Sequence, residues 1–154
     1  MPSFEDLLRR REGCEYTVYA DSVHKKPTVG IGHLVVAADK LKLGDEIDDA
    51  RVKAFFKVDS VKALAAARKQ AGMVKINDKQ FIIYLASVNF QLGTGWFRKF
   101  KKVWAHMKAA DYENAATEVQ KSRWFKQTPK RGKDFQKALL RLAGKAGKDE
   151  DDDK

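Results

Sequence analysis

Two carboxyl groups and a hydroxyl stand close together near the start of the chain, in the stretch REGCEYTVYADSVHKKPTVGIGHL. Glu12 and Asp21 are nine residues apart, and Thr28 follows Asp21 after seven more. A glycoside hydrolase needs such a pair, because one carboxyl gives a proton to the leaving oxygen while the other, ionised, activates water or attacks directly. The spacing alone is weak evidence, since most Glu–Asp pairs at this distance have no joint role and Asp21 could be a turn residue.

Gly30 and Gly32 suggest a second possibility, a loop that binds the phosphates of a nucleotide. The run Gly-Ile-Gly-His offers two of the three glycines of a dinucleotide fingerprint, and no acidic residue follows at the required distance. A phosphate-binding loop would also need a Lys-Ser or Lys-Thr pair, which does not follow these glycines. The two glycines are therefore expected to bend a strand, or to allow the close approach of another backbone or of a substrate.

The histidines and the cysteine supply ligand types for zinc, but their spacing does not. His24, His33, His106 and Cys14 match no zinc-binding signature. The sequence indicates no general base near Cys14, so we expect this cysteine to be a small half-buried thiol and not a nucleophile. We expect neither a metal ion nor a cofactor. The single cysteine also rules out an intrachain disulfide, which fits a chain made in a reducing cytoplasm.

The composition is that of one folded domain with a strongly basic surface. The chain has 154 residues, of which 44% are hydrophobic, and its formal net charge is +10. The last seven residues, 148–154, contribute −3 and resemble a protease-recognition remnant, so we set them apart from a single domain over 1–147. The remaining charge of +13 predicts attraction to a polyanion, which could be nucleic acid, anionic lipid or the bacterial cell wall.

The sequence does not suggest a membrane protein or a signal peptide. The first residues include Glu5, Asp6 and three arginines, where a signal peptide would have an apolar stretch. No apolar run is long enough to span a bilayer. We therefore expect a cytoplasmic chain without stable membrane insertion, which another factor must release if it acts outside the cytoplasm.

Elements near the N-terminus are expected to position the two carboxyl groups. Apolar residues at helical spacing predict a helix over 4–12, which ends at Gly13 and carries Glu12 in its last turn. Two segments rich in β-branched and aromatic residues, 16–19 and 28–31, flank a turn-rich stretch. They predict a small antiparallel sheet.

The rest of the chain is predicted to be helical. A long helix is expected from Asp48 to about Ala71, with Gly72 as its end. Further helices are expected after Asp78, around 97–110, after Asp111 and after Thr128-Pro129. The two aspartates and the threonine are expected to be N-caps, and Pro129 to occupy the first helical position.

The expected fold class is α+β and mainly helical. A sheet lobe over about 14–47 is joined by the linking helix, about 48–71, to a larger helical lobe. This second lobe comprises about 72–144 and the first helix, 4–12. Two lobes on one helical strut would leave a groove between them, and grooves at such junctions are common ligand sites.

Three motifs occur in an order that is typical of one enzyme family. Arg-Glu-Gly, Tyr-Ala-Asp and Pro-Thr-Val-Gly-Ile-Gly-His-Leu lie within 11–34, Asn-Phe-Gln-Leu-Gly at 89–93, and Lys-Ser-Arg-Trp-Phe-Lys-Gln-Thr-Pro-Lys-Arg at 121–131. In turn they resemble the catalytic region, a helix-end motif facing the cleft and the C-terminal signature of T-even-type phage lysozymes, glycoside hydrolase family 24. The likeness covers most of residues 4–140 and implies a lysozyme-like fold. It is far more specific than the acid pair.

The resemblance also implies roles for individual residues. Glu12 matches the general acid, Asp21 the carboxylate that activates water, and Thr28 the hydroxyl that holds this water. The family's reaction resembles a single inverting displacement, in which the two carboxyls stand apart across the sugar. His33 and Asp59 match a histidine–carboxylate pair that is structural in the family, so we do not count them as catalytic.

Further positions match residues that bind the saccharide in the family: Leu34, Phe90, Gln91 and Arg123. The chain departs from its relatives at Val23, where they can carry an acid that closes the cleft against the residue at position 123. This departure leaves the chemistry intact but affects the predicted opening of the cleft.

The resemblance implies an endolysin, a muramidase that lyses the bacterial host of a phage. The expected reaction is hydrolysis of the β-1,4 bond between N-acetylmuramic acid and N-acetylglucosamine in peptidoglycan. The expected partners are peptidoglycan glycan strands and a holin-type pore, which would release a monomeric enzyme from the host cytoplasm. The alternatives are a lytic transglycosylase, a zinc amidase and a basic helical module for nucleic acid. The last is disfavoured because no nucleic-acid motif is present and the lysines are dispersed.

Overall fold

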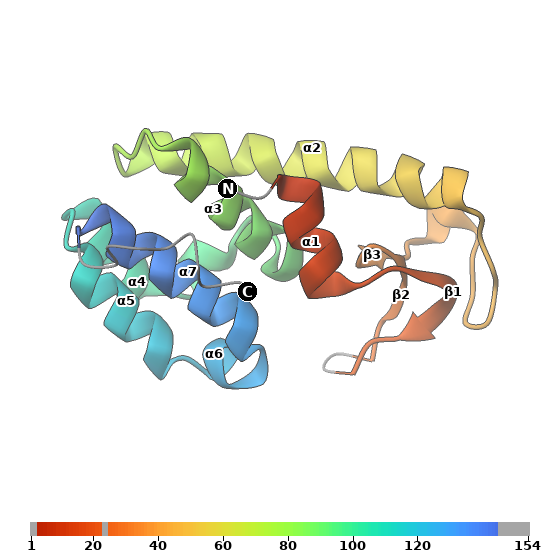
Figure 1. Cartoon of the computed structure of the whole chain (residues 1–154). Helices are drawn as coiled ribbons and strands as arrows, with labels where there is room; N and C mark the ends of the chain where they lie inside the picture. The colour runs from red at the N-terminus through yellow and green to blue at the C-terminus, as the bar shows by residue number, and fades with distance from the viewer. Residues whose placement is uncertain (1–2, 23–24, 145–154) are drawn as a thin grey trace. The chain divides into compact units, whose positions relative to one another are not determined.

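The computed structural model of the chain describes residues 3–22 and 25–144 (Figure 1). The predictions made for Val23, His24 and the acidic tail at 148–154 concern residues outside these ranges. The described residues form seven α-helices and one three-stranded antiparallel sheet. The predicted α+β class, mainly helical, is confirmed.

The chain divides into two compact units. Residues 5–62 form the first, which we call the sheet unit, and residues 63–154 together with 1–4 form the second, the helical unit. The boundary at 62 and 63 falls inside the long helix α2, Asp49–Met73, so this one element contributes to both units.

The sheet unit begins with helix α1, Phe4–Glu12, whose bounds are those predicted. Leu7 and Leu8 are fully buried on its apolar face. Gly13 follows with a positive φ of 72°, and its N–H donates to the carbonyl of Arg9. This conformation suits glycine because it lacks a Cβ, and it ends the helix directly after Glu12.

The sheet has the strand order β1-β2-β3, with β1 at Glu15–Ala20, β2 at Pro27–Gly30 and β3 at His33–Leu34. The first two strands were predicted, whereas the short third strand was not. Gly30 and Gly32 both have positive φ, of 67° and 64°, and they turn the chain so that β3 pairs with β2. A short 3₁₀ helix, η1 at Ala37–Asp39, follows the sheet.

Helix α2 packs against this glycine turn. Asp48 precedes the helix and its carboxylate accepts from the N–H of Arg51, which is an N-cap bond. Val52 is fully buried, and a Cβ added at Gly30 would lie 3.6 Å from its Cγ1. Val18, Val29 and Ile31 complete the buried apolar core of the sheet unit.

The C-terminal end of α2 differs from the prediction that Gly72 terminates the helix. The helix continues to Met73, and Lys75 takes the left-handed conformation with φ 59°. The N–H of Ile76 donates to the carbonyl of Ala71, and that of Lys75 to Gly72, which is the Schellman pattern. Gly72 therefore lies within the helix, and a lysine occupies the position where glycine is usual.

The helical unit contains five further α-helices and a 3₁₀ turn. Their bounds are α3 Lys79–Leu92, η2 Trp96–Arg98, α4 Lys101–Lys108, α5 Tyr112–Lys121, α6 Arg123–Gln127 and α7 Pro129–Leu142. The helix predicted around 97–110 is thus shorter and preceded by a separate turn, and α6 was not predicted. No helix in the described part of the chain is long and apolar enough to cross a membrane.

Two of the three predicted helix caps are confirmed. The carboxylates of Asp78 and Asp111 accept from the N–H groups of Phe81 and Asn114 at the starts of α3 and α5. Thr128 lies at the N-cap position of α7, but its hydroxyl donates to the carbonyl of Trp124 and makes no cap bond. A threonine hydroxyl has this alternative because the end of α6 comes directly before it.

The core of the helical unit combines aromatic packing with one buried pair of amides. The rings of Trp96 and Phe135 meet edge to face at 5.7 Å, and Phe81 lies against Phe135. Gln70 and Asn89 exchange two side-chain hydrogen bonds of 3.0 Å, which ties α2 to α3 inside this unit. Buried amides that satisfy each other in this way fix one arrangement of the two helices, because breaking the pair leaves polar groups without partners.

Gly72→Ala tests where α2 ends. A Cβ at position 72 would meet no atom within 4 Å, so alanine should stabilise the helix interior by about 0.5–1 kcal/mol. The measurement is chemical denaturation of the full chain. Gly44 is the matched control, because its Cβ would also meet nothing but its φ is 90°. Gly44→Ala should lower the free energy of unfolding. An equal decrease in Gly72→Ala would contradict a helix end at Met73 and would support the predicted end at Gly72.

Candidate active site

Asp21 is held in place by the turn that follows β1. Its backbone N–H donates to the carbonyl of Lys26 at 2.9 Å, and its carboxylate accepts from the N–H of Lys26 at 2.8 Å. Asp21 is thus a turn residue, as one reading of the sequence expected. A carboxylate can accept about four hydrogen bonds, so this anchoring orients the group and is compatible with a second role as a base.

Thr28 is anchored on the same residue. It lies on β2 opposite Tyr19 of β1, is 9% exposed, and its hydroxyl donates to the carbonyl of Lys26 at 3.0 Å. The backbone of Lys26 therefore bonds both side chains, through its N–H to Asp21 and through its C=O to Thr28. Because the hydroxyl gives its hydrogen to a carbonyl, its oxygen can still accept a hydrogen bond from a water molecule.

Glu12, the last residue of α1, lies against Gly32. A Cβ added at Gly32 would be 2.7 Å from both Cδ and Oε1 of Glu12, closer than real Cβ contacts occur. The sequence predicted that a glycine here admits another backbone or a substrate, whereas the approaching group is the Glu12 carboxyl. Gly32 thus permits both the turn, with its φ of 64°, and the position of this carboxyl.

Leu34 completes the group of predicted site residues in the sheet unit. It lies on β3, pairs with Thr28 across the sheet and is 48% exposed. A single exposed leucine is common on protein surfaces, so its exposure alone indicates no binding site. The sheet nevertheless brings this side chain, Thr28 and the turn that contacts Glu12 into one small region.

The other three predicted residues, Phe90, Gln91 and Arg123, belong to the helical unit. Gln91 accepts a hydrogen bond of 2.8 Å from the indole of Trp124, the residue next to Arg123 at the start of α6. Phe90 is half-buried and meets Phe4 edge to face at 6.4 Å. Arg123 is exposed. The structure thus brings Gln91 and helix α6 together.

His33 stands between two carboxylates. Its Nδ1 is 2.7 Å from Asp59, as the sequence predicted, and its Nε2 is 2.8 Å from Asp39, which no motif indicated. The ring stacks on Phe55 with centroids 3.9 Å apart. Arg51 donates to the backbone carbonyl of Asp39 and lies over Phe55. This cluster ties β3 and η1 to α2.

The cluster shifts the pKa values of two of its members. Burial favours the neutral imidazole, but the hydrogen bonds and charges of Asp59 and Asp39 outweigh it and raise the pKa of His33. Burial acts against ionised Asp39 as well. The N–H of Val36 and the imidazole of His33 overcome this effect and lower the pKa of Asp39.

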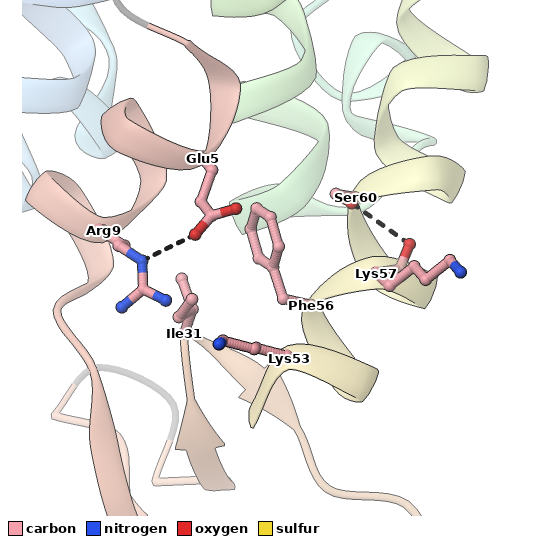
Figure 2. Close-up of a pocket in the computed structure, with 7 residues that line it drawn as sticks. All are labelled: Glu5, Arg9, Ile31, Lys53, Phe56, Lys57 and Ser60. Carbon is pink, nitrogen blue, oxygen red and sulfur yellow. Dashed lines mark hydrogen bonds and ion pairs between the residues drawn. The ribbon is translucent and has the colours of Figure 1, made fainter. Parts of the chain in front are cut away.

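A pocket in the sheet unit lies beside the glycine turn (Figure 2). Its lining side chains come from α1, the turn and α2: Glu5, Arg9, Ile31, Lys53, Phe56, Lys57 and Ser60. Glu5 and Arg9 form an ion pair of 3.0 Å along α1. The three predicted catalytic residues do not line this pocket, and no sequence motif pointed to it.

The residues considered for zinc do not assemble into a metal site in the described ranges. No three His, Cys, Asp or Glu side chains within 3–22 and 25–144 are arranged to hold a metal ion. Cys14 is partly exposed and is a free thiol.

The site residues lie within a segment that matches a known family along most of its length. The family described as Phage lysozyme matches residues 9–142. The chain belongs to the phage lysozyme family. This match includes Glu12, the sheet, α2 and all helices of the helical unit, so the resemblance seen in the three motifs is confirmed.

Two relatives of this phage lysozyme have informative names. The "Peptidoglycan hydrolase gp36" of Pseudomonas phage phiKMV is 26% identical over 133 residues, which are 84% of this chain but 15% of that protein. The "Probable T4-type lysozyme 2" of Dictyostelium discoideum is 28% identical over 151 residues, or 84% of this chain and 88% of the relative. The chain therefore spans a small part of the first relative and most of the second.

The stabilising contribution of His33 should depend on pH. A raised native pKa means that the contribution is complete below the ordinary histidine pKa of about 6.5 and is lost as pH rises through the higher native value. His33→Asn should therefore lower the free energy of unfolding more at about pH 5.5 than at about pH 9. Chemical denaturation of the variant and its parent at both pH values measures this difference.

The two carboxylates provide the controls for this pH dependence. Asp59→Asn and Asp39→Asn should each reduce the pH-dependent difference, because each removes a group that raises the pKa of His33. His106→Asn is the matched histidine control, since His106 is more exposed and lies 3.6 Å from its carboxylate partner. An equal pH response for His33→Asn and His106→Asn would contradict the role of the cluster.

Proposed function

We propose that this phage lysozyme hydrolyses the β-1,4 bond between N-acetylmuramic acid and N-acetylglucosamine in bacterial peptidoglycan. The observation that carries the proposal is the double anchoring on Lys26, whose backbone bonds both the carboxylate of Asp21 and the hydroxyl of Thr28. The family match and the name of the phage relative, a peptidoglycan hydrolase, support the substrate class.

In the proposed reaction each of three side chains has one role. Glu12 gives its proton to the glycosidic oxygen as the bond to the anomeric carbon breaks, so that the leaving sugar departs as an alcohol. Asp21 takes a proton from a water molecule, whose oxygen forms the new bond to the same carbon. Thr28 accepts a hydrogen bond from this water and orients it. A single displacement of this kind inverts the anomeric configuration.

The same proposal assigns saccharide binding to residues of both units. Leu34 offers an exposed apolar surface next to Thr28, and the side chain of Gln91 is oriented by Trp124. Phe90 and Arg123 are assigned by family resemblance, with Arg123 supplying an exposed charged donor. The biological role would be that of an endolysin, a monomer that waits in the host cytoplasm and reaches the wall through a holin-type pore.

The proposal is tested by the products released from purified peptidoglycan. Hydrolysis should leave reducing N-acetylmuramic acid ends, which mass spectrometry distinguishes from other products. The Glu12→Gln variant should fold like the parent and release roughly 10²–10⁴-fold fewer ends, because it cannot donate the proton. Melting temperature recorded beside the rate separates lost chemistry from lost folding.

Other products would identify another wall enzyme. A transglycosylase would leave 1,6-anhydro ends, and an amidase would free peptides from intact glycan. Either result as the main product would overturn the proposed reaction. Near-parent rates in a well-folded Glu12→Gln variant would overturn the proposed role of Glu12 while leaving the reaction itself in place.

Gly32→Ala tests the position of the Glu12 carboxyl. The new Cβ would overlap Cδ and Oε1 of Glu12, so the carboxyl must move by about an ångström or more. A misplacement of this size can cost about 10²-fold in rate. Gly30→Ala is the matched control, because its φ is similar but its Cβ would make an ordinary contact of 3.6 Å with Val52.

Both glycine variants should lose similar stability, since both place alanine at a positive φ. Only Gly32→Ala should lose most of its activity per folded molecule, measured as reducing ends released at a temperature where both variants are folded. Equal specific activities for the two variants would show that the contact with Gly32 does not position the acid.

A further inference from the structure

The net positive charge of the chain lies entirely in one unit. Residues 5–62 contain 11 Lys and Arg and 11 Asp and Glu, so the sheet unit has no net charge. Residues 63–144 of the helical unit contain 17 Lys and Arg against 5 Asp and Glu, a net charge of +12. The basicity noted for the whole chain is thus a property of the helical unit, whereas the unit with the proposed catalytic residues has equal numbers of positive and negative side chains.

The densest part of this charge is the segment 121–133, which we call the α6 segment. It includes all of α6 and the start of α7, and it contains six Lys and Arg and no Asp or Glu. Lys126, Lys130 and Lys133 are exposed. Arg131 is the exception, because it is buried and donates to Ser87. The other cations of the segment are exposed to solvent, where they can contact a large anionic partner.

Within residues 63–144, the surface of the helical unit has few exposed large apolar side chains. Large apolar side chains that are exposed in the described ranges are Tyr16, Leu34, Val36, Leu43, Val58, Val61 and Met73. Met73 is the only one of them in the helical unit. An amphipathic membrane anchor needs exposed apolar residues beside its cations, and a single-strand nucleic-acid surface needs aromatic ones. Charge attraction is therefore the main interaction that this surface offers.

We infer that the helical unit binds a phosphate-bearing polymer of the bacterial cell wall, and that the α6 segment is the centre of this surface. The inference rests on the proposed function, because a polyanion attached to the wall is the one that raises the local concentration of a wall-cleaving enzyme. Ammonium groups of lysine suit a flexible phosphodiester chain, since they act as point charges without demanding a fixed geometry.

The division of charge assigns binding of the wall polymer to one unit and cleavage of the glycan to the other. At physiological salt the screening length is about 8 Å, so the cations act mainly on a polymer that touches their own surface. Many cations on one unit allow such a polymer to bind in several orientations and to slide along the surface, because no single pairing has to form. The neutral sheet unit is then free to select its saccharide by contact instead of charge.

The test uses the full chain in a Glu12→Gln background, so that the wall is not digested during binding. The helical variant carries Lys126→Gln, Lys130→Gln and Lys133→Gln. The control carries Lys42→Gln, Lys57→Gln and Lys62→Gln, three exposed lysines of the sheet unit, so both variants lose the same net charge. Binding is measured by co-sedimentation with peptidoglycan sacculi at about 50 and about 200 mM salt. The sacculi either retain their phosphodiester polymer or have been stripped of it.

The helical variant should bind polymer-bearing sacculi roughly tenfold more weakly than the parent at low salt. The slope of log affinity against log salt should also fall by about two to three, as expected for three lost ionic contacts. The control variant should change by less than about twofold. Stripped sacculi should bind the parent weakly and should not distinguish the two variants.

Equal binding to stripped and polymer-bearing sacculi would overturn the inference, and so would equal losses in the two variants. Tighter binding of the parent to a DNA duplex than to polymer-bearing sacculi would overturn it in favour of nucleic acid. The proposed function fails separately, if the native enzyme releases no reducing ends from stripped sacculi. The affinities of the Glu12→Gln proteins do not depend on that result.

Discussion

The sheet unit depends on the turn at Gly30–Gly32. Two positive φ angles in three residues reverse the chain between β2 and β3, and this reversal determines the surroundings of all three residues. Gly30 admits Val52 of α2, Ile31 is buried, and Gly32 admits the carboxyl of Glu12. A side chain at either glycine would strain the backbone, and at Gly32 it would also displace Glu12. The turn therefore links the fold of the unit to the position of its proposed acid.

The cluster around His33 stabilises this turn, because His33 directly follows Gly32. His33 begins β3 and reaches Asp59 on α2 and Asp39 on η1, so a single imidazole joins three elements. Its two carboxylates overcome the effect of burial and keep it protonated to a higher pH than usual. The charged hydrogen bonds of His33 thus stabilise the turn whose shape depends on the absence of a side chain at Gly32, the residue before it. This arrangement explains why a histidine close to the proposed acid has a structural role.

The sequence was most informative where one residue determines the local conformation. Gly13 ends α1 and Asp78 caps α3 as predicted, because each effect depends on neighbours along the chain. It was misleading at Gly72, because α2 continues to Met73 and a left-handed Lys75 closes the helix end instead of a glycine. Motif resemblance supplied the residues that are proposed for the site. It could not reveal the contact of Glu12 with Gly32 or of Asp39 with His33, because these depend on how separate elements meet.

The anchoring of Asp21 and Thr28 uses the backbone of Lys26, so it does not depend on the lysine side chain. Any residue except proline would supply the same N–H and C=O groups. The next residue, Pro27, restricts Lys26 to extended conformations because its ring would clash with a helical one. Pro27 also begins β2, which fixes the direction of the chain into Thr28. The proposed base and the hydroxyl are therefore oriented by the two backbone polar groups of a single residue, whose conformation Pro27 restricts, and this anchoring does not depend on which side chain stands at position 26.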